Sequence, residues 1–260
     1  MSQMLRDAMR RYIAIIILLL TACVREPSET APIASDLVAL LDQHAEARGG
    51  KSAIEAIQSV SVTLEITEPA FTVSGYYRAL RAGQMRIDIF DAGQKVFTEA
   101  LGPDGGWQIS GDGTAADLST DGASALQRGV INNLYGLHEL PGLGYDLDLI
   151  GSTERNNSTF WEIKITAPDG FSEHVFLDKD TFLISSKVET SALHPDLDPE
   201  KTHQETFFTD YRETGGVLFS HKSETRNIET GDLMQTAIVT SHNVNMALGK
   251  KEFRRPAGAS

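Results

Sequence analysis

The residue types that carry most enzyme chemistry are present in this 260-residue chain, but not in the spacings that such chemistry requires. Gly50-Lys51-Ser52 matches the end of a phosphate-binding loop. That loop also needs a glycine at position 45, where Ala45 stands, and a preceding strand in place of the helical pattern found there. A serine nucleophile of the hydrolase type would show as Gly-x-Ser-x-Gly, and the sequence lacks this string. The sequence therefore predicts neither nucleotide binding nor serine-hydrolase activity.

Carboxylates and imidazoles, the usual metal ligands, are scattered along the chain. Asp112, Asp117 and Asp121 lie five and four residues apart, which does not fit the alternating oxygen positions of a calcium loop. None of the seven histidines forms a His-Glu-x-x-His pair, and His194 and His203 flank an acidic, proline-containing segment typical of a surface loop. We therefore predict no metal, no cofactor and no enzymatic activity. A hydrolase or metal enzyme whose residues converge only in space is the less favoured alternative.

Cys23 is the only cysteine of the chain, and its surroundings indicate a different chemistry. Three arginines within residues 6–11 precede an aliphatic run over 13–20, and Leu-Thr-Ala-Cys follows. The run is too short to span a bilayer, which takes about 20 apolar residues. A short apolar run with basic residues before it and small residues after it indicates a removable export signal. Leu-Thr-Ala-Cys matches the lipobox of bacterial lipoproteins, which implies that the thiol of Cys23 accepts a diacylglycerol lipid.

We expect residues 1–22 to be a lipoprotein signal peptide and Cys23 to carry acyl chains of the palmitate type. An ordinary secretory signal with a chance cysteine is the alternative. Residues 23–35, which are polar and twice interrupted by proline, predict a flexible tether. An aspartate after the cysteine would signal inner-membrane retention in enteric bacteria, so Val24 favours the periplasmic face of the outer membrane. With one cysteine, no intramolecular disulfide is possible.

The charge balance of the chain limits its partners. The formal net charge is −13, and removal of residues 1–22 would make it −15. Such an acidic chain is unsuited to nucleic acid and to electrostatic attachment to anionic lipid. The expected membrane contact is therefore the N-terminal lipid anchor. The sequence does not indicate a protein partner.

Hydrophobic periodicity divides the rest of the chain into helices and strands. Leu37, Leu40, Leu41 and His44 follow a helical spacing, and Gly49-Gly50 ends this helix before a shorter one over 52–57. From residue 60 the period changes to two, which indicates half-buried strands. A further helix is expected over 123–135. The expected strands cover 60–67, 71–80, 84–90, 95–101, 106–110, 145–150, 160–167, 173–177, 183–190, 204–211, 217–226, 234–240 and 244–246.

This order predicts a mainly β (α+β) fold, because strands precede and follow one helical segment without a repeated βαβ pattern. The alternation indicates an antiparallel sheet with one solvated and one buried face. A long, strongly curved sheet that encloses the apolar sides of the helices is the simplest arrangement. We expect a single domain over 36–256, followed by a tail over 257–260.

Four segments of the sequence, taken in order, resemble LolA/LolB-like envelope proteins. They are the helix-to-strand junction 47–60, the strand-turn-strand segment 175–184, the paired segments 208–212 and 216–219, and the closing Phe-Arg-Arg-Pro at 253–256. The resemblance implies a half-open antiparallel β-barrel with helices over its mouth. It also implies a concave apolar cavity for acyl chains. Relatives with this fold also sense lipids or stress.

The apolar strand positions supply the candidate lining of such a cavity. Trp107 is the strongest single candidate, since it follows two glycines at a strand start and a large amphipathic ring suits a cavity rim. A closed core is the alternative use of the same residues. The full set is Val62, Leu64, Phe71, Val73, Tyr77, Ile87, Ile89, Trp107, Trp161, Ile163, Phe176 and Phe207.

The function expected from these features is non-enzymatic binding. A lipid-anchored envelope protein would hold lipid or lipoprotein acyl chains in its apolar cavity. The alternative is an envelope interaction or stress-sensing lipoprotein with the same fold and a filled core, for which a large exposed apolar patch would be the sign.

Overall fold

A computed structural model describes residues 31–257 of the chain. The predicted signal peptide, Cys23 and most of the tether lie outside the described residues. The described residues from Ile33 onward belong to one compact unit. Within the described part, no helix combines the length and apolar character needed to cross a membrane.

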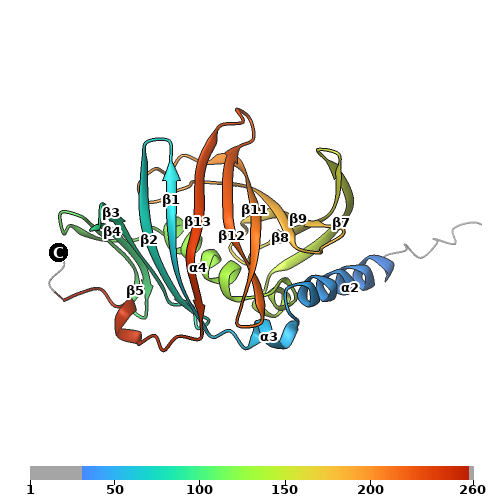
Figure 1. Ribbon diagram of the computed structural model, residues 1–260, viewed down its shortest axis with the longest axis horizontal. Helices are drawn as coiled ribbons and strands as arrows, with labels where there is room; N and C mark the ends of the chain where they lie inside the picture. Colours follow the sequence, from blue (N-terminus) through green and yellow to red (C-terminus); the bar gives the residue numbers. More distant parts are fainter. Residues whose placement is uncertain (1–30, 258–260) are drawn as a thin grey trace, which may run out of the picture. The chain divides into compact units, whose positions relative to one another are not determined.

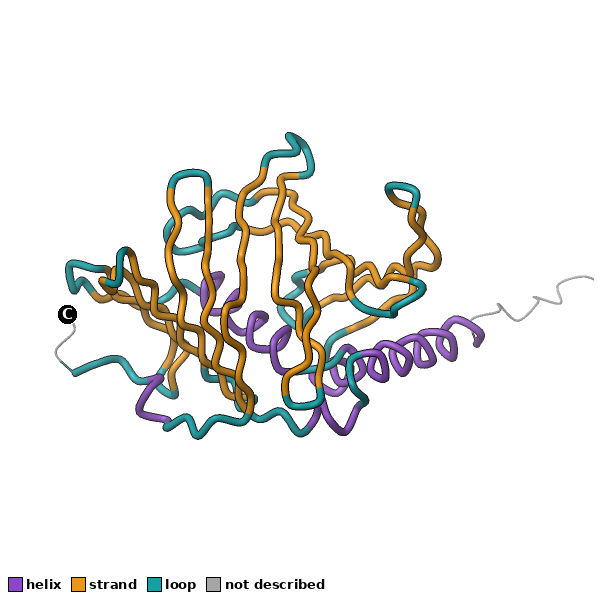
Figure 2. The backbone as a smooth tube through the Cα atoms, viewed as in Figure 1, coloured by secondary structure: helices purple, strands orange, loops and turns teal. Residues whose placement is uncertain are grey.

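One open antiparallel sheet of 13 strands forms the framework (Figures 1 and 2). Its spatial order is β6-β5-β4-β3-β2-β1-β13-β12-β11-β10-β9-β8-β7, so the first and last strands pair at its centre and β6 and β7 are its free edges. The strands are β1 (Ser59–Glu68), β2 (Phe71–Leu80), β3 (Met85–Asp91), β4 (Gln94–Gly102), β5 (Gly105–Ser110), β6 (Ala115–Asp117), β7 (Asp146–Arg155), β8 (Ser158–Thr166), β9 (Ser172–Asp178), β10 (Ile184–Ser191), β11 (Thr202–Thr214), β12 (Val217–Asn227) and β13 (Leu233–Val244).

The described residues form three α-helices, α2 (Ala31–Ala47), α3 (Lys51–Glu55) and α4 (Thr120–Leu134). Contacts with β1–β4 place α4 along the concave side of the sheet (Figure 1). Ser119 caps the start of α4 by accepting a hydrogen bond from Gly122 N at 3.0 Å. A 3₁₀ segment, η1 (Leu137–Leu143), leads from α4 to β7. Gly49, at the end of α2, has φ +122°, and a Cβ there would clash with the carbonyl oxygen of Gly216. Glycine at this position therefore lets the helix end meet the β11–β12 turn.

Two apolar clusters fill much of the space between helices and sheet. The first packs Ile54, Val130 and Leu134 from the helices against the strands around β1 and β2. The second packs Leu40 and Leu41 of α2 against β7–β9. Strand alternation explains both clusters, because every second side chain of each strand faces the helices.

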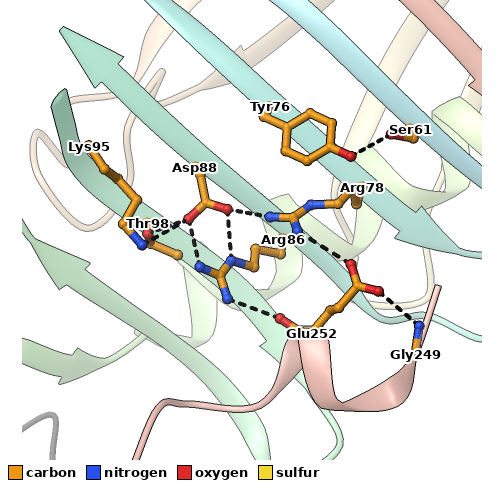
Figure 3. Close-up of polar contacts among 9 residues, drawn as sticks. All are labelled: Ser61, Tyr76, Arg78, Arg86, Asp88, Lys95, Thr98, Gly249 and Glu252. Atoms are coloured by element: carbon orange, nitrogen blue, oxygen red, sulfur yellow. Dashed lines mark hydrogen bonds and ion pairs between the residues drawn. The ribbon is translucent and has the colours of Figure 1, made fainter. Parts of the chain in front are cut away.

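The C-terminal segment covers the opposite, convex face. Its short 3₁₀ turn, η2 (Lys250–Phe253), lies against β3 and β4, and Phe253 is fully buried. Trp107 Nε1 donates a hydrogen bond to the carbonyl oxygen of Phe253 at 3.0 Å. Figure 3 shows the ion-pair network beside this contact, in which Arg78 and Arg86 converge on Asp88 and also reach Glu252.

The predicted fold class is confirmed, since the chain forms one curved, unclosed antiparallel sheet with covering helices. The single strand β13 covers the strand expected over 234–240 and only the first residue of the one expected over 244–246. Its pairing with β1 is shifted between Thr63 and Leu64. The domain limits 36–256 and the tail 257–260 stay predictions.

Candidate functional site

A cavity of about 430 Å³ lies on the concave face, between the sheet and α4. This volume is within the range of small-molecule sites in proteins, about 300–1,000 Å³. Strands β1–β3 form one wall and β9–β13 the other, while the residues around 129–137 contribute the α4 side. The cavity is therefore built mainly on strands, which hold side chains more rigidly than loops do.

The wall formed by β1–β3 is apolar. Val62, Leu64, Tyr77 and Ile87 occupy successive inward positions, since Tyr77 pairs with Val62 on one side and with Ile87 on the other. Val239 of β13 continues the same wall, because its pairing partner is Leu64. This arrangement offers a continuous apolar surface with little polar chemistry.

The wall formed by β10–β13 carries polar side chains at the equivalent inward positions. Lys187, Thr206 and Thr225 follow one another across three paired strands. His221 and His242 face the same space, with ring centroids 5.9 Å apart, and Phe219 stacks on His242 at 4.2 Å. The cavity therefore has an apolar and a polar side, which differs from the uniformly apolar interior that the sequence suggests.

The end of α2 adds two buried basic side chains, His44 and Arg48. His44 is fully buried, and its Nδ1 lies 2.7 Å from the carbonyl oxygen of Phe182, so Nδ1 donates the hydrogen bond. Its Nε2 has no hydrogen-bond partner in the described part of the chain. The guanidinium of Arg48 lies 5.7 Å from the ring centroid of Phe219. Both basic groups therefore reach the polar side of the cavity.

Burial changes the pKa of several of these groups. It lowers the pKa of His44 to about 4, with a further decrease from Arg48, and lowers that of His242 to about 4, with a further decrease from His221. Burial also lowers the pKa of Arg48 and raises that of Tyr211 to about 12. Near neutral pH, both low-pKa histidines are therefore uncharged, and Arg48 is the cation at this end of the cavity.

We predict that the protein loses stability on mild acidification because of His44. Above pH 6.5 this histidine is neutral in both the folded and unfolded states. Between pH 6.5 and about 4 only the unfolded state takes up the proton, which costs about 1.4 kcal/mol per pH unit. His44→Asn keeps a donor near Phe182 but does not titrate, so its unfolding free energy, from urea titrations at pH 7, 6 and 5, should fall less steeply than that of wild type. Equal slopes would show that His44 is not the group responsible.

A second, polar hollow of about 570 Å³ adjoins the cavity and shares Gly129, Asn132, Glu173 and Lys187 with it. Lys187 Nζ lies 2.8 Å from Glu189 and 3.3 Å from Glu173. Burial would raise the pKa of Glu189, but the contact with Lys187 outweighs it and holds the pKa at about 2. Lys187 is therefore neutralised by its own ion pairs.

The segment 192–201 extends from this hollow toward the opposite wall. His194 Nε2 lies 2.8 Å from Glu68 of β1, and Asp196 accepts a hydrogen bond from Ser119 N at 2.9 Å. Glu99 faces the same contacts, and burial followed by the charge of Asp196 raises its pKa. The acidic loop thus ties β1 to the start of α4. Within the described residues, no three His, Cys, Asp or Glu side chains are arranged to hold a metal ion.

The structure separates the residues expected to line the cavity into three groups. Val62, Leu64, Tyr77 and Ile87 line it. Phe71, Val73 and Ile89 share their face of the sheet beyond the cavity, and Trp161 and Ile163 belong to the second apolar cluster. Trp107, Phe176 and Phe207 lie on the convex face. Each is paired with residues of the neighbouring strands whose side chains point away from the cavity.

Trp107 in particular does not form a cavity rim. It is buried beneath the C-terminal segment, where its indole nitrogen has a backbone partner. Phe176 is similarly engaged on the convex face, under the guanidinium of Arg155. Large aromatic residues occupy both faces of this sheet, so residue type alone did not identify the inward face.

Sequence reasoning missed the polar side of the cavity, namely Arg48, Lys187, His221 and His242. His242 pairs with Val62, which lines the cavity. His221 lies an even number of residues from Thr225 on β12, so both side chains face the cavity. The signal was present as polar residues at alternate positions of late strands. This signal could be interpreted only once the strand register was known, because β1, near the start of the domain, pairs with β13, the last strand.

Comparison with known proteins identifies the fold. The sequence matches no protein family model and no curated protein. Among solved structures, a putative outer membrane lipoprotein-sorting protein domain from Vibrio parahaemolyticus is similar with a TM-score of 0.57 at 12% identity, over 83% of this chain and 95% of that one. A DUF1329 family protein from Desulfovibrio piger has a TM-score of 0.56 at 14% identity, over 83% and 96% of the two chains.

A LolA superfamily protein from Nitrosomonas europaea is also similar, with a TM-score of 0.53 at 12% identity, over 84% of this chain and 96% of that one. The chain therefore has a LolA-like fold, and the similarity covers almost the full length of these three solved structures. The resemblance found in the sequence is confirmed at this level.

Proposed function

We propose that this chain is a lipid-anchored protein of the bacterial envelope that binds lipid or lipoprotein acyl chains, without catalysis, in the cavity beneath α4. The observation that carries the proposal is a hollow of about 430 Å³ with an apolar wall on the inner face of an open sheet. Similar solved structures include a putative lipoprotein-sorting domain and a LolA superfamily protein, which supports the same class of ligand.

The apolar wall supplies the affinity that such binding needs. Val62, Leu64, Tyr77, Ile87 and Val239 form a continuous surface. Transfer of a methylene group from water to such a surface gains about 0.8 kcal/mol. An acyl chain can therefore bind through area alone, with no catalytic group and no cofactor.

The proposed anchor fits the charge of the chain. A net charge of −13 provides no electrostatic hold on anionic lipid, so a covalent lipid on Cys23 would keep the protein at a bilayer. We propose the periplasmic face of the outer membrane as its site, with 23–35 as the tether, of which 31–35 already belong to α2, and 36–256 as the binding domain. Mass spectrometry of the N-terminal peptide from native membranes tests the lipidation directly.

Ala237→Trp should strongly weaken acyl-chain binding while preserving the fold. Ala237 lies on β13 opposite Ile66, lines the cavity and has space on its inward side. Exclusion of about three methylene groups, worth about 0.8 kcal/mol each, corresponds to about 50-fold weaker binding. The measurement is displacement of a fluorescent fatty acid from the delipidated protein.

Ser241→Trp is the matched control, since it adds the same ring to the exposed face of the same strand. It should bind the probe as wild type does. Comparable binding by all three proteins would contradict the cavity as the site. The absence of binding by wild type would reject the proposed function and favour the alternative, an interaction or stress-sensing lipoprotein whose two apolar clusters serve as a filled core.

A further inference from the structure

Arg48 is a buried cation without an acidic partner. The residue is 9% exposed, and its Nε and Nη1 donate only long hydrogen bonds, to the carbonyl oxygens of Leu218 at 3.4 Å and of Tyr135 at 3.3 Å. Among residues 36–257, no carboxylate lies within ion-pair distance of it, and its Nη2 has no acceptor. A buried charge in this state is costly unless something else neutralises it.

Other well-buried arginines of the protein are neutralised. Arg78 and Arg86, whose side chains are 11% and 15% exposed, share Asp88, and Arg81, 13% exposed, binds Glu139. Glu139 is also the acid whose field acts on Arg48, yet both of its oxygens are occupied by Arg81, at 2.7 and 3.1 Å. Arg48 therefore lacks a direct ion-pair partner among the surrounding described residues.

Basic side chains surround the open side of Arg48. Its guanidinium lies 5.7 Å from the ring centroid of Phe219, which stacks on His242 at 4.2 Å, and the ring of His221 lies 5.9 Å from that of His242. His242 Nδ1 is buried, lacks a partner among the described atoms and can donate a hydrogen bond when protonated. Lys187, another cation that lines the cavity, is already bound by Glu173 and Glu189.

These basic groups adjoin the apolar wall. His242 pairs directly with Val62 across the β1–β13 junction, and Val239 and Ala237 follow it along the strand. A ligand that placed a polar end at Arg48 would therefore lay an apolar chain along β13 and β1. An anionic end would supply the charge that Arg48 lacks.

We infer that the cavity takes an amphiphile with an anionic head group, a carboxylate or a phosphate, and that Arg48 binds this group beside His242. The inference rests on the proposed function and specifies its ligand class. The bound anion would accept from the free Nη2 of Arg48 and from Nδ1 of His242, in the tautomer that protonates this nitrogen. The acyl chain would occupy the wall of Val62, Leu64 and Val239.

The test compares pairs of probes that share an acyl chain and differ in whether the head group is charged. Palmitate is measured against methyl palmitate, and a lysophosphatidic acid against the monoacylglycerol of the same chain, by displacement of a bound fluorescent acyl probe from delipidated protein. Wild type should prefer each anion by about 10- to 100-fold. Comparison of the two anions distinguishes a carboxylate from a phosphate ligand.

Arg48→Gln should remove the preference and leave the neutral probes bound within about twofold, and Arg48→Lys should retain part of it. His203→Gln, at an exposed site on β11, is the control and should behave as wild type. Equal binding of anionic and neutral probes by wild type would overturn the inference while leaving the proposed function intact. Binding of neither class would reject the proposed function itself. Because the wild-type preference needs no variant, a misfolded Arg48→Gln protein would not obscure the result.

Discussion

Asp88→Asn is expected to lower the free energy of unfolding by about 3–5 kcal/mol, a large part of the stability of a single domain. Asp88 is 5% exposed and accepts hydrogen bonds from Arg86 at 2.7 and 2.9 Å, from Thr98 at 2.7 Å and from Arg78. Burial would raise its pKa, but the hydrogen bonds from Arg86 and Thr98 hold the pKa below its usual range. Asparagine would remove the carboxylate that two buried guanidinium groups share, leaving Arg78 with Glu252 alone. Urea unfolding followed by circular dichroism measures the loss.

The same change should loosen the C-terminal segment on the convex face. Arg78 and Arg86 are positioned by Asp88 and in turn hold Glu252 through its carboxylate and its carbonyl oxygen (Figure 3). Trypsin should therefore cut at Lys250 and Lys251 earlier in Asp88→Asn than in wild type. Asp91→Asn, an exposed site at the end of the same strand, is the control, with an expected effect within about 0.5 kcal/mol. A loss of less than about 1 kcal/mol in Asp88→Asn would refute the role assigned to this network.

The parts of the fold that depend on local periodicity could be predicted from the sequence. Alternation over 60–67 predicted β1, which extends over Ser59–Glu68, and the helical spacing of Leu37, Leu40 and Leu41 predicted α2. The order of elements excluded a parallel sheet, and the paired strands within residues 31–257 are all antiparallel. These features depend on neighbours within about ten residues, which a sequence shows directly.

The inward face of each strand could not be predicted in the same way. Phe176 lies on the convex face and its neighbour Val175 on the concave one, although both are apolar. The choice depends on register across strands that are far apart in the chain, as in the β1–β13 pair. The C-terminal segment adds a second reason, because it covers Trp107 and so gives the convex face a buried layer of its own.

The basic end of the cavity was hidden for a related reason. Arg48 belongs to a segment whose Gly49 and Gly50 indicate a helix end, which explains the glycines but gives no reason for the arginine. Its significance appears only when Phe219, His242 and the occupied Glu139 are located around it in space. An unpaired buried charge is a property of the assembled structure, and the proposed ligand class follows from that property.

Arg81→Met is expected to cost about 3–5 kcal/mol of unfolding free energy. Arg81, in the turn between β2 and β3, contacts α3, α4, η1 and the segment between α3 and β1. Its guanidinium donates to the carbonyl oxygens of Ile57 at 2.9 Å, Ile54 at 3.0 Å and Leu134 at 2.9 Å, and binds both oxygens of Glu139. Methionine fills a similar volume but leaves Glu139 unpaired and three carbonyl oxygens without this donor.

A double variant distinguishes loss of the Arg81–Glu139 ion pair from a simple packing defect. Glu139→Leu in the Arg81→Met background removes the stranded carboxylate, so the double variant should recover part of the loss, with a coupling of about 1–3 kcal/mol. Arg226→Met, at a half-exposed arginine on β12, is the control for loss of an arginine and should change stability by less than about 1 kcal/mol. Hydrogen exchange should locate the Arg81→Met effect at the end of α4 and in η1, where Leu134 and Glu139 lie. Strictly additive single losses would instead assign the effect to packing around Tyr135, on whose ring Arg81 lies at 4.2 Å.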